Sequence, residues 1–376
     1  MESLALYDHL KAIQHAALPH FYFERINFGI KELAEWHTVK RTIAAPQLLN
    51  ELGVRRNEDI QKLRQLLIEK GTIEPLSSEA LADDLANLPI KHLGFYLDVY
   101  VLTIGDYAAV YDAVKAKLAK DGRVDNYENC LYIAAYLAAM IDDDAVAYLD
   151  RAKELANDQY EKILCQHRLA TYYIKRTKDD EKQSESLSQL FYMINQIDEE
   201  AVRWAYTAIF DNLYSLFLTK HHTPYKQIMV LLQNALSVIK ASLNSQIFTD
   251  QMKIQIARYR SQLSINLSQL YADKDHAPEA IAILLDDLKI VQRYAPDYLG
   301  ECYGALAYTY YLNKDYDAAI EYGTKAYEFF EAIGSVAGWN TSKDLLVAAH
   351  YKHGDTELAQ QYFDATLDNL IPSDNA

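Results

Sequence analysis

The sequence predicts an all-α fold, a solenoid in which pairs of helices stack one upon the next. Three observations lead to this prediction. Gly and Pro are scarce, at 12 and 8 of 376 residues, and helix interiors tolerate few of either. One internal frame of apolar, aromatic and small residues recurs along the chain. Finally, the chain is long for a single core, whereas a solenoid grows simply by adding units.

The repeat is clearest towards the C-terminus, where two segments align without a gap. They share an apolar residue, a ring one turn later, an Asp at a turn and then a small residue. The matching pairs are Leu306/Leu346, Tyr310/His350, Asp315/Asp355 and Ala319/Ala359. Further copies lie at Leu267 (with Tyr271 and Ala280), around Tyr132 (with Tyr136, Ala145, Leu149 and Ala152) and at Leu97 (with Gly105 and Asp106 at the turn). Between Leu155 and Tyr259 the frame blurs, and we expect about two degenerate units there.

Each unit reads as two antiparallel helices that meet at a small residue and cannot bury their apolar face alone, so that units stack. Ala319 and Ala326, seven residues apart after the turn, resemble the small positions of the tetratricopeptide repeat. The spacing of 40 residues from Leu306 to Leu346 exceeds the family's roughly 34. Gly323 also stands where the family prefers a large aromatic residue. The resemblance implies a right-handed α-solenoid over residues 93–376.

Residues 1–92 do not follow the repeat frame. Within them, residues 36–76 resemble a winged helix-turn-helix, with Gly53 at the turn and Gly71 as a helix C-cap. This segment carries seven Lys/Arg against five Asp/Glu. As a DNA reader it would use Arg55, Arg56, Gln61, Lys62 and Arg64. Alternatively, the same helices form a cap that shields the first repeat, and both interpretations stay open.

Charge and motifs narrow the function. The net charge of −16 disfavours general binding to nucleic acid, because an acidic surface repels phosphate. No signal peptide or membrane span is evident, and three scattered cysteines fit a reducing compartment, so we expect a cytoplasmic protein. No phosphate loop, dinucleotide fingerprint or zinc motif occurs. The run Asp142–Asp144 falls at a turn where Asp caps a helix. We therefore predict a non-enzyme without metal or cofactor.

A ligand site is predicted on one polar helix face. Polar side chains recur at helical spacing on the helix before Leu267, namely Gln255, Arg258, Gln262, Asn266 and Gln269. Asn212 precedes Leu213 just as Asn266 precedes Leu267. A carboxamide can donate to a peptide carbonyl and accept from a peptide N–H at once, which suits a groove for an extended peptide. Tyr308 and Tyr311 would add aromatic walls. The alternative is an ordinary solvated helix face.

The repeat architecture and the residues Asn212 and Asn266 resemble the peptide-pheromone receptor regulators of Gram-positive bacteria and their phages. The resemblance implies a role in quorum sensing, in which a short signalling peptide binds inside the solenoid and alters DNA or partner binding. It thereby implies transcription regulation. The alternative is a scaffold that binds a protein partner through the same solenoid, without DNA. Assembly into a homodimer is left open.

Overall fold

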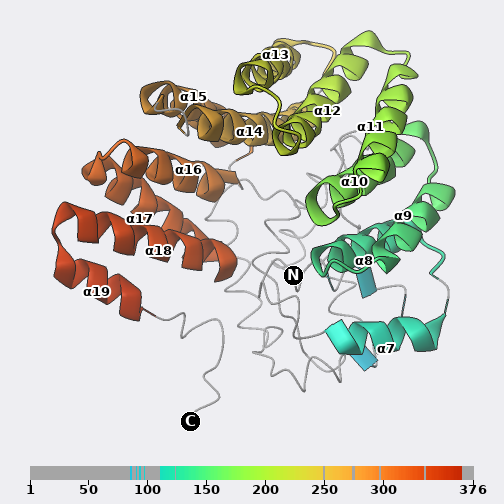
Figure 1. Cartoon of the computed structure of the whole chain (residues 1–376), viewed down its shortest axis with the longest axis horizontal. Helices are drawn as coiled ribbons and strands as arrows, with labels where there is room; N and C mark the ends of the chain where they lie inside the picture. Colours follow the sequence, from blue (N-terminus) through green and yellow to red (C-terminus); the bar gives the residue numbers. More distant parts are fainter. Residues whose placement is uncertain are drawn as a thin grey trace, which may run out of the picture. The chain divides into compact units, whose positions relative to one another are not determined.

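The computed structural model describes residues 111–365, except 123, 249, 273–275, 296–297 and 334–335, together with 85–86, 90, 93–94 and 97. All regular elements among these residues are helical, and consecutive helices pack on one another over residues 127–195 and again over residues 200–364, which confirms the all-α solenoid (Figure 1). The predicted winged segment 36–76 with Arg55, Arg56, Gln61, Lys62 and Arg64 lies outside the described residues. The described helices fall into two compact units, one ending at Asp198 and the other beginning at Glu199.

The first unit contains five described helices. They are α7 (Tyr111–Asp121), α8 (Tyr127–Ala139), α9 (Asp144–Leu155), α10 (Gln159–Arg176) and α11 (Asp180–Asn195). Helix α9 packs on both α8 and α10, and α10 packs on α11. The predicted repeat positions Tyr132, Tyr136, Ala145, Leu149 and Ala152 are all buried. After Leu155, where the repeat pattern in the sequence is weak, the chain continues with the packed helix pair α10 and α11.

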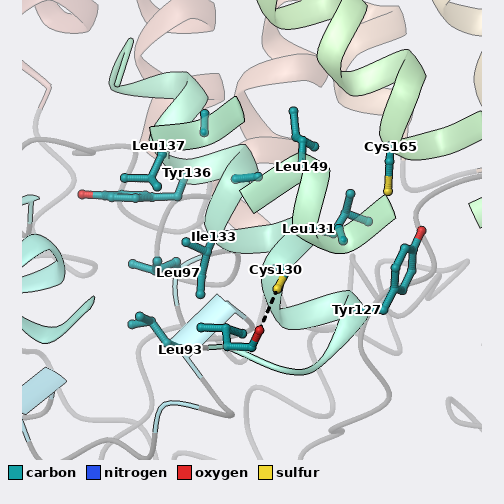
Figure 2. Close-up of a cluster of buried hydrophobic side chains, with 14 of the residues drawn as sticks. Leu93, Leu97, Tyr127, Cys130, Leu131, Ile133, Tyr136, Leu137, Leu149 and Cys165 are labelled. Atoms are coloured by element: carbon teal, nitrogen blue, oxygen red, sulfur yellow. Dashed lines mark hydrogen bonds between the residues drawn. The ribbon is translucent and has the colours of Figure 1, made fainter. Parts of the chain in front are cut away.

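The core of the first unit joins α8 and α9 to the chain before them (Figure 2). Leu93 and Leu97 are fully buried against α8, and each such leucine contributes about 1.5–3 kcal/mol. The buried side chain of Asn129 accepts a hydrogen bond from the Gly94 amide and donates one to the Ile90 carbonyl. These contacts attach the start of the predicted repeat region to α8. Two free thiols, Cys130 and Cys165, are also buried in this core.

The second unit contains eight described helices. They are α12 (Glu200–Lys220), α13 (Tyr225–Asn244), α14 (Asp250–Ala272), α15 (Ala277–Tyr294), α16 (Leu299–Leu312), α17 (Tyr316–Ile333), α18 (Val336–His353) and α19 (Thr356–Asp364). Each packs on the next, and α14 also contacts α12 and α16, while α16 contacts α18. We call α12, α14, α16 and α18 the inner row. Among the described residues no comparable packing joins α13, α15, α17 and α19, so the inner row is the more tightly spaced of the two.

The C-terminal repeat frame reappears as equivalent contacts in space. Leu306 and Leu346 are both fully buried, and Ala319 and Ala359 are buried as well. The pairing also extends to ring contacts, which sequence comparison did not specify. Tyr310 stacks on Tyr322 and His350 stacks on Tyr362, with ring centroids 5.6 and 5.3 Å apart. Both ring partners lie twelve residues further along the chain, so the two units are built alike.

Four of the turns between paired helices use one backbone motif. In each turn one of the first two residues after the first helix has a positive φ: 58° at Ile141, 56° at His222, 63° at Lys314 and 106° at Gly354. The amide of the following residue donates to a carbonyl five residues back, as Asp355 does to His350 at 2.9 Å. This satisfies a carbonyl that the helix end would leave unpaired. Only one of the four turns uses Gly, the residue without a steric penalty at this φ.

Ile141 is the least suited of these residues, because a β-branched side chain in the left-handed region is strained. Its side chain is 59% exposed, so its packing contributes little. We expect Ile141→Gly to stabilise the protein by about 0.5–1 kcal/mol, after subtracting the entropy that Gly adds to the unfolded chain. Urea denaturation would measure the change. The control Val146→Gly, within α9, should lower stability instead. A lower stability of Ile141→Gly would contradict the proposal that the positive φ of Ile141 is strained.

Candidate functional site

Three residues of the predicted polar stripe form an exposed strip of α14, and Arg258 is partly buried. Gln262, Asn266 and Gln269 are exposed, while Leu263 and Leu267 beside them are buried in the core. The alternation follows from helical geometry, because neighbouring residues point about 100° apart. Gln255 lies on the same helix. The stripe is thus on the surface of the inner row, where a ligand has access to it.

Asn266 and Asn212 meet across two helices of the inner row. The Asn266 side-chain amide donates a hydrogen bond to the side-chain oxygen of Asn212 on α12, at 2.7 Å. The two residues are 54 positions apart in the sequence and occupy equivalent places in their units. After this bond, Asn212 keeps both of its N–H donors and Asn266 keeps both lone pairs of its oxygen. The pair therefore presents donors and acceptors together at an exposed place.

Arg258 of α14 contacts Tyr298, just before α16, the next helix of the inner row. Its guanidinium donates to the Tyr298 hydroxyl at 2.9 Å and lies 4.4 Å from the centroid of that ring. Tyr298 is the residue before α16 begins. A cation held over an aromatic ring is stabilised by the ring's quadrupole. Arg258 therefore joins α14 to α16 and forms the border of the stripe.

The two predicted aromatic walls differ in exposure. Tyr308 on α16 is 46% exposed, so its ring is free to contact a ligand. Tyr311 is partly buried and packs against Tyr316 at the start of α17, with ring centroids 5.8 Å apart. Tyr311 thus supports the turn between the two helices, and Tyr308 is the better candidate for a contact.

Two residues of α12 were missed by the sequence reasoning. Asp211 directly precedes Asn212 and is partly buried, and burial raises its pKa to about 6. Trp204 lies seven residues earlier, on the same side of the helix, and is 56% exposed. The sequence did contain a signal for Asp211. The dipeptide Asp211-Asn212 aligns with Ile265-Asn266 of α14, so an acid stands where the equivalent helix has an apolar residue.

A buried ion pair holds α14 to α15 beneath the stripe. The Arg260 guanidinium donates to a carboxylate oxygen of Asp287 and of Asp286, at 2.6 Å in both cases. Arg260 is 2% exposed and Asp287 is fully buried. Arg260 and Gln262 are two positions apart and therefore point to different faces. The pair fixes the helix that carries the stripe.

The carboxylates Asp142, Asp143 and Asp144 serve structural roles in the first unit. The Asp142 side chain accepts a hydrogen bond from the Asp144 amide at the start of α9, whereas Asp143, the N-cap residue, makes no side-chain capping bond. Asp142 also accepts from Tyr111 and Lys115 of α7, and Asp143 accepts from the Tyr172 hydroxyl of α10. Among the described residues, no three His, Cys, Asp or Glu side chains are placed to hold a metal ion. No described helix is long and apolar enough to cross a membrane.

Comparisons with known proteins add little about chemistry. No family model and no curated protein matches the chain. One similar solved structure is titled "Crystal structure of Aspartyl phosphate phosphatase F from Bacillus subtilis". It is 14% identical, covers 86% of this chain and 93% of that chain, and has a TM-score of 0.46. A likeness of this size supports no inference about the activity of this chain.

Proposed function

We propose that the chain is a regulatory binding protein whose inner row holds an extended peptide or a segment of a partner protein. The observation that carries this proposal is the exposed hydrogen bond between Asn266 and Asn212. Two carboxamides that bond to each other across neighbouring helices keep unused donors and acceptors side by side. A peptide backbone offers the matching groups at every residue. The stripe residues Gln262 and Gln269 extend the same chemistry along α14.

The proposal explains why polar residues lie on an inner helix of a repeat protein. Carboxamides bind the backbone without reading side chains, so they supply affinity for any extended segment. The exposed ring of Tyr308 supplies apolar contact area at low cost in side-chain entropy. Arg258 is already engaged with Tyr298 and helps to hold α16 at a fixed distance from α14. The proposed peptide contacts are Asn212, Arg258, Gln262, Asn266, Gln269, Tyr308 and Tyr311.

We expect Asn266→Ala to weaken peptide binding by about tenfold, because losing the amide leaves a ligand group unsatisfied at roughly 1–3 kcal/mol. The Tm should change little, since the residue is exposed. The probe is a pool of random heptapeptides, selected on immobilised protein and then measured singly by fluorescence anisotropy.

Asn234→Ala is the matched control, because Asn234 is also exposed but lies on α13, outside the inner row. It should leave affinity unchanged. Equal affinities of the wild type and Asn266→Ala would contradict the proposed site. Failure of the wild type to retain any peptide would contradict the proposed function itself.

The regulatory output is a separate part of the proposal. If peptide binding controls transcription, residues 36–76 would contact DNA through Arg55, Arg56, Gln61, Lys62 and Arg64. Binding of wild-type protein to duplex DNA at low salt, with and without a selected peptide, tests this part. A complete absence of duplex binding in both conditions would favour the capping interpretation of residues 1–92.

One observation favours the scaffold alternative. The C-terminal pair α18–α19 exposes three apolar side chains, Tyr351 at 64%, Leu358 at 41% and Phe363 at 65%. Exposed aromatic side chains are enriched at protein interfaces. A scaffold would lose its partner on Phe363→Ser and would be insensitive to Asn266→Ala. The peptide receptor predicts the reverse, so the two variants separate these functions.

A further inference from the structure

Among the described residues, the carboxylate of Asp211 has no counterion. In the part of the chain that the structure describes, no hydrogen bond or ion pair reaches it. The side chain is nevertheless partly withdrawn from water, and burial raises its pKa to about 6. Above that pH the group is charged, and a charge that is partly desolvated without a partner is unfavourable. Folded proteins keep such groups mainly where they have a use.

The position of Asp211 connects it to the amide pair. It directly precedes Asn212, whose side-chain oxygen is bonded to Asn266. The Cα atoms of Asp211 and Asn212 are about 3.8 Å apart, but on α12 the two side chains point about 100° apart. A segment held by the two amides would therefore need a long side chain to reach around the helix to the carboxylate. Its side chains would be the nearest groups able to pair with it.

The two arginines of α14 do not serve as counterions of Asp211. Arg258 is the stripe's one basic residue, and its guanidinium is bonded to the Tyr298 hydroxyl and stacked on that ring. The second arginine of α14, Arg260, points into the core towards Asp287. The acidic balance of the chain, at −16, also favours cationic over anionic ligands. Charge complementarity thus indicates what the ligand should carry.

We propose that Asp211 binds a basic side chain, Lys or Arg, of the peptide segment that Asn212 and Asn266 hold. This inference rests on the proposed peptide-binding function and names the ligand's chemistry. The amides bind the backbone without selecting a sequence, whereas the carboxylate selects a cationic residue. Trp204, two helical turns away on the same side of α12, offers an exposed ring to a neighbouring ligand residue or to the stem of the basic side chain.

The test uses three pools of N-acetylated, C-amidated heptapeptides in which one residue is fixed as Lys, Gln or Glu, so that terminal charges cannot contribute. Wild-type protein at pH 7.5 should retain the Lys pool about tenfold better than the Gln pool, with the Glu pool weakest. Asp211→Asn should bind Lys and Gln pools equally well. Asp211→Lys should prefer the Glu pool. Glu328→Gln, an exposed acid on α17, should keep the Lys preference.

The outcomes separate the two proposals. Peptide binding without preference for Lys, or an unchanged Lys preference in Asp211→Asn, would overturn the role of Asp211 and leave the peptide-binding function standing. Failure of the wild type to retain any of the three pools would instead remove the proposed function. Raising the salt concentration should weaken the Lys preference, since a partly exposed ion pair is screened.

Discussion

Replacing Arg260 with Met should lower the free energy of unfolding by about 3–5 kcal/mol, the cost typical of breaking a buried ion pair from one side. Arg260 is 2% exposed and pairs with the fully buried Asp287. Without the guanidinium, the Asp287 carboxylate stays in the core without its cation. Its second oxygen already lacks a hydrogen bond of good geometry. Urea unfolding followed by tryptophan fluorescence measures the change, because Trp204 and Trp339 both belong to the second unit.

The loss should depend on pH with a definite sign. Burial raises the pKa of Asp287 to about 6, while Arg260, Ser261 and Ser264 oppose the rise. Removing Arg260 therefore raises this pKa further. A folded pKa above the unfolded value of about 3.9 means that the folded state binds the extra proton between them, so stability falls as pH rises through that window. The cost of Arg260→Met should be small near pH 5 and largest near pH 8.

Two controls separate the ion pair from simple loss of packing. Arg258→Met removes a partly buried guanidinium two residues away, which contacts Tyr298, and should cost no more than about 1 kcal/mol. The double variant Arg260→Met with Asp287→Leu should recover most of the stability, because it leaves no uncompensated charge. A double variant as unstable as Arg260→Met would show that the ion pair itself, and not the orphaned carboxylate, supplies the stability.

The fold was largely predictable because the repeat frame encodes helix pairing locally. An apolar residue, a ring one turn later and a small residue after the turn define the same faces in each unit, as Leu306, Tyr310 and Ala319 show. The frame also aligned His350 with Tyr310, although the two residues differ chemically, while their stacking on Tyr362 and Tyr322 is seen only in the structure. The turn residues were less predictable. Ile141 and His222 occupy left-handed positions for which local preference favours Gly, so tertiary packing overrides propensity there.

The candidate site was predictable only in part. Helical spacing placed Gln262, Asn266 and Gln269 on one exposed face, which the structure reproduces. The bond between Asn266 and Asn212 needed the distance between two helices, which spacing along one helix does not contain. The buried Arg260 did leave a signal, since it lies four residues after Ile256 and three before Leu263, on the apolar side of α14. Its partners could not be named, because α15 offers Asp286 and Asp287 side by side.

Leu306→Ala should destabilise the second unit by about 3 kcal/mol, whereas Tyr308→Ala, two residues later on the same helix, should cost less than about 0.5 kcal/mol. Leu306 is fully buried with Leu284 and Cys302, so its truncation leaves a cavity between α15 and α16. Tyr308 is 46% exposed, so little packing is lost with its ring. Urea unfolding of both variants provides the comparison.

The same two variants distinguish the structural side of α16 from its ligand side. If Tyr308 contacts the bound segment, Tyr308→Ala should weaken binding of a selected heptapeptide several-fold at unchanged stability, since a well-placed aromatic contact contributes about 0.5–1.5 kcal/mol beyond its buried area. Leu306→Ala should keep its affinity under conditions where the protein remains folded. If instead Leu306→Ala alone impaired binding, in proportion to the unfolded fraction, Tyr308 would be an ordinary exposed residue. The ligand contacts would then be confined to α12 and α14, where Asn212 and Asn266 meet.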